Sequence, residues 1–143
     1  MGEPAIQTVT LTLYRFESLA TRLWAFAMMG LARPQMSRID GLNFWKLCGS
    51  GTGEGFTPKP NTRVYGMLCV WPDEDVAREV LQNEPIFGRY RSRATEAWTV
   101  FLAPVSTWGA WSGVAPFHVQ EPGYQGPLAA LTRATLRPGA LMR

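Results

Sequence analysis

The sequence is poor in the residues from which metal and hydrolytic sites are built. Its 143 residues include one histidine, His118, and two cysteines, Cys48 and Cys69. A single histidine excludes a metal motif with two histidine ligands, and the cysteines form no CxxC pair. Both cysteines lie in apolar runs, which favours buried thiols in a reducing compartment. His118 is a candidate axial iron ligand and each cysteine a candidate thiolate ligand, although a lone loop histidine is more often simply exposed.

Several other functional motifs are also missing. Ser50 is not part of a Gly-x-Ser-x-Gly elbow, because residue 48 is a cysteine. No Gly-Lys-Ser/Thr follows the glycines after Cys48, and their spacing does not fit a dinucleotide-binding Gly-x-Gly-x-x-Gly. Residues 63–70 fit the RNA-recognition pattern at the first, third and fourth places, but they lack its second-place glycine and its later aromatics. We therefore expect no nucleic-acid partner.

Charge and long apolar runs are scarce. Charged residues make up 17% of the chain, and the net charge of +3 mildly favours anionic partners. Residues 23–32 form the longest apolar run, whereas a membrane span needs roughly 20 residues. The first ten residues lack the pattern of a signal peptide. These features predict a cytoplasmic protein that is soluble or peripheral on a membrane.

The periodicity predicts an α+β fold. Residues 8–13 alternate as a half-buried strand, and Ser18 is a candidate N-cap of a helix that ends or restarts near Arg33, before Pro34. The apolar stripe of that helix is expected to face the core and consists of Leu19, Leu23, Phe26, Ala27, Gly30 and Leu31. Strands follow at 43–48 and 63–71, a helix begins at Pro72-Asp73-Glu74-Asp75 and breaks at Pro85, a second helix covers 86–94, and a strand covers 96–103.

The resulting order, β-α-β-β-α-β, is the ferredoxin-like arrangement with an antiparallel sheet, of the dimeric α/β-barrel type. It assigns residues 1–104 to one ferredoxin-like unit and 105–127 to an irregular linker rich in proline and glycine. Residues 128–136 look like a strand and 138–141 like a helix start. We expect 128–143 to begin an incomplete second unit, in a partial chain or in one that pairs with another chain.

A glycine stands at every second position from 49 to 55, between a strand and a Pro-Lys-Pro turn. A backbone without Cβ atoms can approach a ligand closely, and the entropy that these glycines lose on folding needs compensation. This pattern predicts a ligand-contacting loop, and its alternative is a long mobile hairpin loop.

Two basic regions are further candidates. Arg22 and Arg33 flank the apolar run 23–32, which is expected to be a core helix; the alternative places its Trp24 and Met28 edge in a membrane interface. The second region holds Arg89, Arg91 and Arg93, which form either a solvated helix end or a docking patch for an acidic electron-transfer partner.

The sequence resembles the spheroidene monooxygenase family, carotenoid ketolases of purple photosynthetic bacteria. The stretches that carry the resemblance are 8–16, 22–34, 44–61, 71–73, 86–87, 89–91, 98–101 and 111–113, and the glycine segment is the most specific of them. Members of this family are longer and have a second ferredoxin-like half, and residues 128–138 resemble its first strand.

The resemblance implies oxidation of an acyclic carotenoid, of the spheroidene-to-spheroidenone type, by dioxygen. It also implies haem as cofactor and reduced ferredoxin as electron donor, and it assigns no iron ligand. The rival interpretations are a non-catalytic ferredoxin-like domain that forms a homodimer or pairs with a partner chain, and a cofactor-free monooxygenase of the same fold.

The site hypothesis places a flat apolar guest against the glycine loop. An apolar slot would be lined by the aromatic residues Phe44, Trp45, Phe56 and Trp98, whose ordinary role is core packing. Cations for haem propionates would come from Lys46, Arg63 or Lys59. The loop backbone would contact the guest at Gly49, Gly51 and Gly53.

Overall fold

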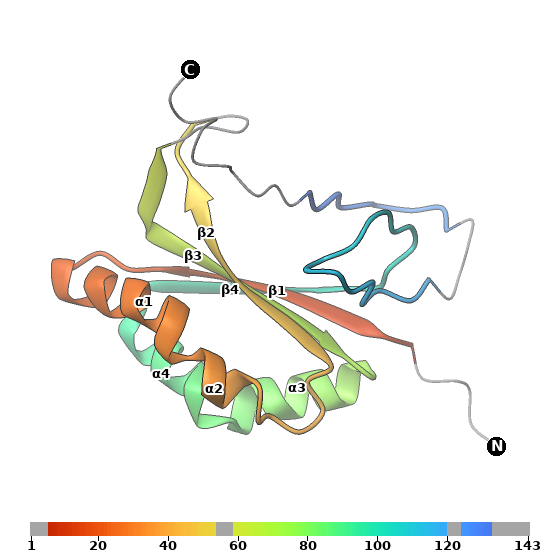
Figure 1. Ribbon diagram of the computed structural model, residues 1–143, viewed down its shortest axis with the longest axis horizontal. Helices are drawn as coiled ribbons and strands as arrows, with labels where there is room; N and C mark the ends of the chain where they lie inside the picture. Colours follow the sequence, from red (N-terminus) through yellow and green to blue (C-terminus); the bar gives the residue numbers. More distant parts are fainter. Residues whose placement is uncertain (1–5, 54–58, 120–123, 133–143) are drawn as a thin grey trace.

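The computed structural model describes residues 6–53, 59–119 and 124–132 (Figure 1). Its elements, in chain order, are β1 (Thr8–Arg15), α1 (Leu19–Leu31), α2 (Arg33–Met36), β2 (Phe44–Gly51), β3 (Pro60–Trp71), α3 (Glu74–Asn83), α4 (Pro85–Arg93) and β4 (Glu96–Leu102). The strands form one antiparallel sheet in the order β2-β3-β1-β4, with the helices on one face. The predicted α+β ferredoxin-like fold is confirmed.

Local sequence signals determine where the helices begin. The Ser18 hydroxyl accepts a hydrogen bond from the Thr21 N–H at 3.1 Å, and the Asp73 carboxylate accepts one from the Val76 N–H at 2.8 Å. Pro34 and Pro85 lie in the first turns of α2 and α4, where a missing N–H is tolerated. Each proline therefore ends one helix and starts the next.

The hairpin of β2 and β3 is longer than the sequence predicted. The expected strand ended at Cys48, whereas β2 continues through Gly49 and Gly51, with a bulge between Gly49 and Ser50. The Thr52 N–H donates to the Lys59 carbonyl at 3.1 Å and extends the ladder. The first glycines are therefore strand residues, because β3 begins at Pro60 and supplies their pairing partners.

The main core lies between the sheet and the helices. Fully buried side chains there include Phe16, Trp71, Ile86 and Phe87. The threonine side of β1 also faces the helices: the Trp71 indole N–H donates to Thr10 Oγ1 at 2.9 Å, and the Thr12 and Thr99 hydroxyls lie 2.8 Å apart. These hydrogen bonds satisfy polar groups that burial would otherwise destabilise.

Helix α1 is rotated relative to the sequence expectation. Its predicted core stripe faces solvent, with exposed fractions of 67% for Leu19, 60% for Leu23, 70% for Phe26 and 72% for Leu31. The buried side carries Ala25 and Met28. The predicted orientation is wrong because α1 has apolar residues on every side, so periodicity alone cannot select the buried one.

The alternative prediction, that the Trp24 and Met28 edge of α1 enters a membrane interface, is also wrong. Met28 is buried, and the Trp24 ring centroid lies 5.0 Å from that of Tyr90 and 6.0 Å from that of Phe16. Within the described residues, no helix is long and apolar enough to cross a bilayer.

The other face of the sheet is covered over part of its length by residues 103–119, here called the strap. The strap has no helix or strand apart from an isolated bridge between Trp111 and Val114. Trp111 and Phe117 pack on Val9, Leu68 and Val70. Residues 128–132 have no regular structure and 133–143 lie outside the described residues, so the second unit stays a prediction.

Candidate functional site

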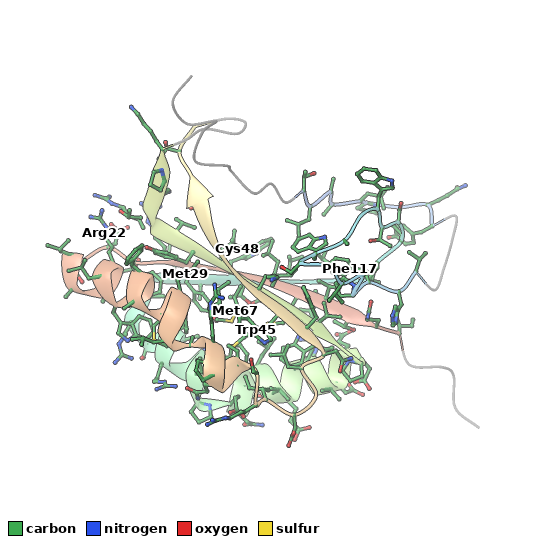
Figure 2. The ribbon with its side chains drawn as sticks, viewed as in Figure 1. Arg22, Met29, Trp45, Cys48, Met67 and Phe117 are labelled. Carbon is green, nitrogen blue, oxygen red and sulfur yellow. The ribbon has the colours of Figure 1, made fainter. Side chains whose placement is uncertain are left out.

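The sheet separates two residues that the sequence analysis placed in one site. Neighbouring residues of a strand point to opposite faces. Trp45 pairs with Cys69 and packs on the main core, whereas Lys46 pairs with Leu68 on the strap side. Figure 2 shows Trp45 beside Met67 on the helix side of the sheet, with Cys48 on the other side. Trp45 and Lys46 therefore do not line one pocket.

The expected aromatic slot is not assembled either. Phe44 and Trp98 share the strap-side face, but they belong to the two edge strands and to different rows of paired residues. Phe44 lies in the row with Val70, which the strap covers, and Phe56 lies outside the described residues.

The three candidate cations do not converge. Lys46 Nζ donates to Ser112 Oγ of the strap at 2.6 Å and lies 5.6 Å from the Phe44 ring centroid. Arg63 is at the other end of the sheet, with its guanidinium 3.6 Å from the Glu17 carboxylate. Lys59 is exposed on the hairpin. Only Lys46 of these three is positioned on the strap-side face.

The glycine segment does not border a described cavity. A Cβ on Gly49 would meet no heavy atom within 4 Å, Gly51 pairs with Pro60, and Gly53 has a φ of +76°, which favours glycine. Two open cavities, of about 390 and about 650 Å³, lie elsewhere. One is lined by residues of α3, α4 and β4, and the other by residues around the start of β1, the start of α3 and the end of β4. Gly55 lies outside the described residues.

The strongest structural candidate is the part of the strap-side face that the strap leaves open. One row crosses all four strands as Cys48, Gly66, Leu13 and Trp98, and the next row contributes Val100. We call these five residues the open patch. Trp98 is 58% and Leu13 36% exposed, which is unusual for large apolar side chains on the face of a sheet.

Gly66 is the smallest residue of the open patch and is itself buried between its neighbours. A Cβ there would lie 3.5 Å from Leu13 Cδ2 and 3.7 Å from the Cys48 Cβ, so a side chain larger than that of alanine would press on these two residues. Sequence reasoning missed this feature. A glycine inside a predicted strand was the available signal, because such a glycine marks a place where another group can approach the backbone.

The two cysteines have different environments. Cys69 is buried under the helices, and burial raises the pKa of its thiol, which makes it a poor thiolate ligand. Cys48 lies on the open patch and is half-buried. His118 is exposed in the strap, and its backbone N–H donates to the Gln7 amide oxygen at 2.7 Å.

The fit of a haem to these residues is incomplete. The open patch offers one flat apolar wall, with Cys48 on it and Lys46 in the adjacent row. A haem also needs a second wall, and the two described cavities are lined by other residues. Within 6–53, 59–119 and 124–132, no three His, Cys, Asp or Glu side chains gather as a metal site. The described residues therefore do not enclose a haem by themselves.

The arginines of α4 also point in two directions. Arg91 donates to the Leu81 carbonyl of α3 at 2.7 Å, whereas Arg89 donates to the Gln35 side chain and Arg93 lies 4.5 Å from the Trp24 ring centroid. The three arginines do not form a single patch, and two of them border α1 and α2.

Fold and site together define a ferredoxin-like α+β domain with one partly uncovered apolar sheet face. Among solved structures, a Pseudomonas aeruginosa protein has a TM-score of 0.53 at 11% identity, over 73% of this chain and 100% of the other. A likeness at this identity shows the fold alone. No protein-family model matches the chain.

Two curated relatives identify the resemblance more closely. The chain is 46% identical to the spheroidene monooxygenase of Cereibacter sphaeroides over 92% of its own length and 41% of the relative's. It is 42% identical to that of Rhodobacter capsulatus over 90% of its own length and 55% of the relative's. The resemblance to the spheroidene monooxygenases is thereby confirmed across most of the chain, which spans about half the length of these relatives.

Proposed function

We propose that this chain is part of a carotenoid monooxygenase that oxidises an acyclic carotenoid of the spheroidene type. The observation that carries the proposal is the 46% identity with a spheroidene monooxygenase over 92% of the chain. The chain covers 41% of that relative, so the activity is proposed for the whole protein that contains it.

The open patch supports this function as one wall of the substrate site. A polyene is long, rigid and apolar, and a four-stranded sheet offers a flat surface roughly 14 Å across, at about 4.8 Å per strand spacing. Gly66, which has no side chain, and the flat Trp98 ring lie in one row across this surface. Polyene contacts there would remove Trp98 and Leu13 from water, which stabilises binding by about 25 cal/mol per Å² of apolar area.

Haem and reduced ferredoxin remain part of the proposal for the whole protein. A bound haem would supply dioxygen activation, and Cys48 and Lys46 are the described residues best placed to face it from the sheet. The second wall would have to come from residues beyond those described or from another chain. A spectral titration of the protein with haem tests this directly, with Cys48→Ser as the variant and Cys69→Ser as its buried control.

A sheet-pairing domain is the second candidate function. The same exposed Leu13 and Trp98 side chains favour it, because a second copy laid on the open patch would bury both. This candidate predicts a concentration-dependent dimer that Trp98→Lys dissociates.

The activity test uses this chain, and the longest reading frame that contains it, in a host that accumulates spheroidene. We expect the extracted pigment to contain the ketone. Gly66→Val, which inserts a branched side chain between Leu13 and Cys48, should lower product formation at least tenfold, whereas Gly49→Ala, on the other face with open space around it, should not.

The outcomes separate the proposals. No ketone from either reading frame would overturn the proposed activity. Normal product with Gly66→Val would remove the open patch from the site while leaving the activity in place. A stable dimer without oxidation, dissociated by Trp98→Lys, would favour the sheet-pairing domain.

A further inference from the structure

The outer surface of α1 is apolar along the whole helix. Leu19, Leu23, Phe26 and Leu31 are each more than half exposed, and Ala27 and Gly30 lie among them. We call these six residues the α1 stripe. Its side chains are not needed for the core, because Ala25, Met28 and Ala32 fill that role on the opposite side of the helix. Monomeric proteins rarely expose a contiguous apolar patch without a binding function.

Arginines border the α1 stripe on both of its long sides. Arg22, labelled in Figure 2, and Arg33 flank it on α1 and α2. Arg22 contacts Thr62, and the Arg33 Nε–H donates to the Met29 carbonyl at 3.0 Å. On the other side, α4 places the Arg93 guanidinium 4.5 Å from the Trp24 ring centroid and Arg89 against Gln35. Long arginine stems can lie along apolar surface while their charged ends reach polar groups.

Acidic residues are absent from the same elements. Residues 18–39, which contain α1 and α2, and residues 85–95, which contain α4, include no Asp or Glu. Glu17, next to the start of α1, lies 2.5 Å from Arg15 and 3.6 Å from Arg63. The surface around the α1 stripe therefore carries an excess of positive charge.

We propose that the α1 stripe is a membrane-docking surface that inserts between anionic lipid headgroups. A convex helix with an apolar outer side and arginines along both edges has the pattern of an interfacial helix, which lies in the plane of the membrane surface. Each arginine near an anionic surface adds electrostatic attraction that weakens as salt rises. A protein partner would instead be expected to need acidic counterparts and a shaped groove, and the exposed side of α1 is convex.

Figure 1 shows α1 on one face of the sheet, and the exposed side chains of the α1 stripe point away from the core on that face. The open patch lies on the opposite face of the sheet. Lipid binding and oxidation can therefore be tested separately. The proposal that the α1 stripe docks on a membrane does not rest on the proposed activity, although such docking would suit a protein whose substrate dissolves in lipid.

The test is sedimentation of the purified chain with vesicles of phosphatidylcholine alone or of an equal mixture with phosphatidylglycerol. We expect binding to the anionic vesicles, weaker binding to the neutral ones, and loss of binding as salt rises. The double variant Leu23→Gln and Phe26→Gln should lower the partition coefficient at least tenfold. Both residues are exposed, so the fold should be kept, and circular dichroism and a thermal melt check this.

Trp108→Gln is the matched control, because Trp108 is 96% exposed but lies in the strap. It should bind vesicles as the unchanged chain does. Failure of the unchanged chain to bind anionic vesicles would overturn the proposal. Equal binding by the α1 variant would also overturn it, and so would self-association through the stripe, abolished by Phe26→Gln, without vesicle binding.

Discussion

The two faces of the sheet are packed by different means. The helix side buries large side chains such as Trp71 and Phe87 completely, and hydrogen bonds there join Trp71 to Thr10 and Thr12 to Thr99. The strap side buries a small cluster under Trp111 and Phe117 and leaves Leu13 and Trp98 in contact with solvent. The comparison teaches that the two faces are closed to different degrees: the helix side is fully packed, and the strap side keeps apolar surface in contact with water.

The largest expected effect comes from truncating one aromatic residue on each face. Phe87→Ala should lower the free energy of unfolding by about 3–5 kcal/mol, because it removes a fully buried ring. Trp98→Ala should change it by less than about 1 kcal/mol. Denaturant unfolding monitored by circular dichroism measures both. Similar losses for the two variants would mean that the strap side is as important for stability as the helix side.

The two cysteines report on the difference in solvent access between the helix side and the strap side. We expect Cys48 to react with a thiol reagent at least about a thousand times faster than Cys69, which needs an opening of the structure before it can react. Labelling kinetics of Cys48→Ser and Cys69→Ser variants separate the two thiols. Rapid labelling of Cys69 in the native protein would contradict the packing described for the helix side.

Alkaline pH should weaken the helix side. Burial raises the pKa of Tyr90 to about 12 and raises the pKa values of Tyr14 and Cys69, so these groups stay neutral longer in the folded state than in the unfolded state. The unfolded state therefore releases these protons at lower pH than the folded state does. The contribution of these groups to the free energy of unfolding is fully present below pH about 9 and is lost as the pH rises toward 12. The loss from Tyr90 alone should be on the order of 2 kcal/mol.

Unfolding in denaturant across this pH range measures that loss. Cys69→Ala should flatten the first part of the decline, just above pH 9, because it removes the group that titrates earliest in the unfolded chain. A free energy of unfolding that stays constant up to pH 11 would show that these groups are not shielded from water.

The smallest expected difference in stability is between alanine variants of two glycines. Gly41 has a φ of +85°, and a Cβ there would lie 2.8 Å from the Val76 Cγ1 of α3, so Gly41→Ala should destabilise the protein by about 1–2 kcal/mol. Gly49 lies in β2 with open space around it, so Gly49→Ala should be neutral within about 0.5 kcal/mol. Thermal melts of the two variants test the pair, and a large loss for Gly49→Ala would indicate an unseen contact of the hairpin.

Much of the fold could be predicted from local signals. Ser18 and Asp73 mark helix starts, Pro34 and Pro85 mark restarts, and alternation marks the strands, so the order of elements was correct. The orientation of α1 was not predictable, because the helix is apolar all round and its buried side is chosen by contacts with Phe16 and Tyr90. Such contacts depend on residues that are distant in sequence.

The candidate site was less predictable than the fold. The glycine run drew attention to 49–55, but part of that run is paired strand. The open patch depends on which face each strand residue occupies and on how far the strap reaches. Trp45 and Lys46 look like neighbours in sequence and lie on opposite faces, which follows from strand geometry only once the strand register is known.

The hydroxyls of β1 have a consequence for how the chain reaches a single structure. If β1 slipped by one residue, Val9, Leu11 and Leu13 would enter the helix side, and the Trp71 indole would lose its acceptor on Thr10. Hydrophobic burial alone would favour that shifted register, since leucine and valine are more apolar than threonine. The buried hydroxyls of Thr10 and Thr12 therefore destabilise the shifted register relative to the native one. In the native register the leucines face the opposite side of the sheet, where a ligand can reach them.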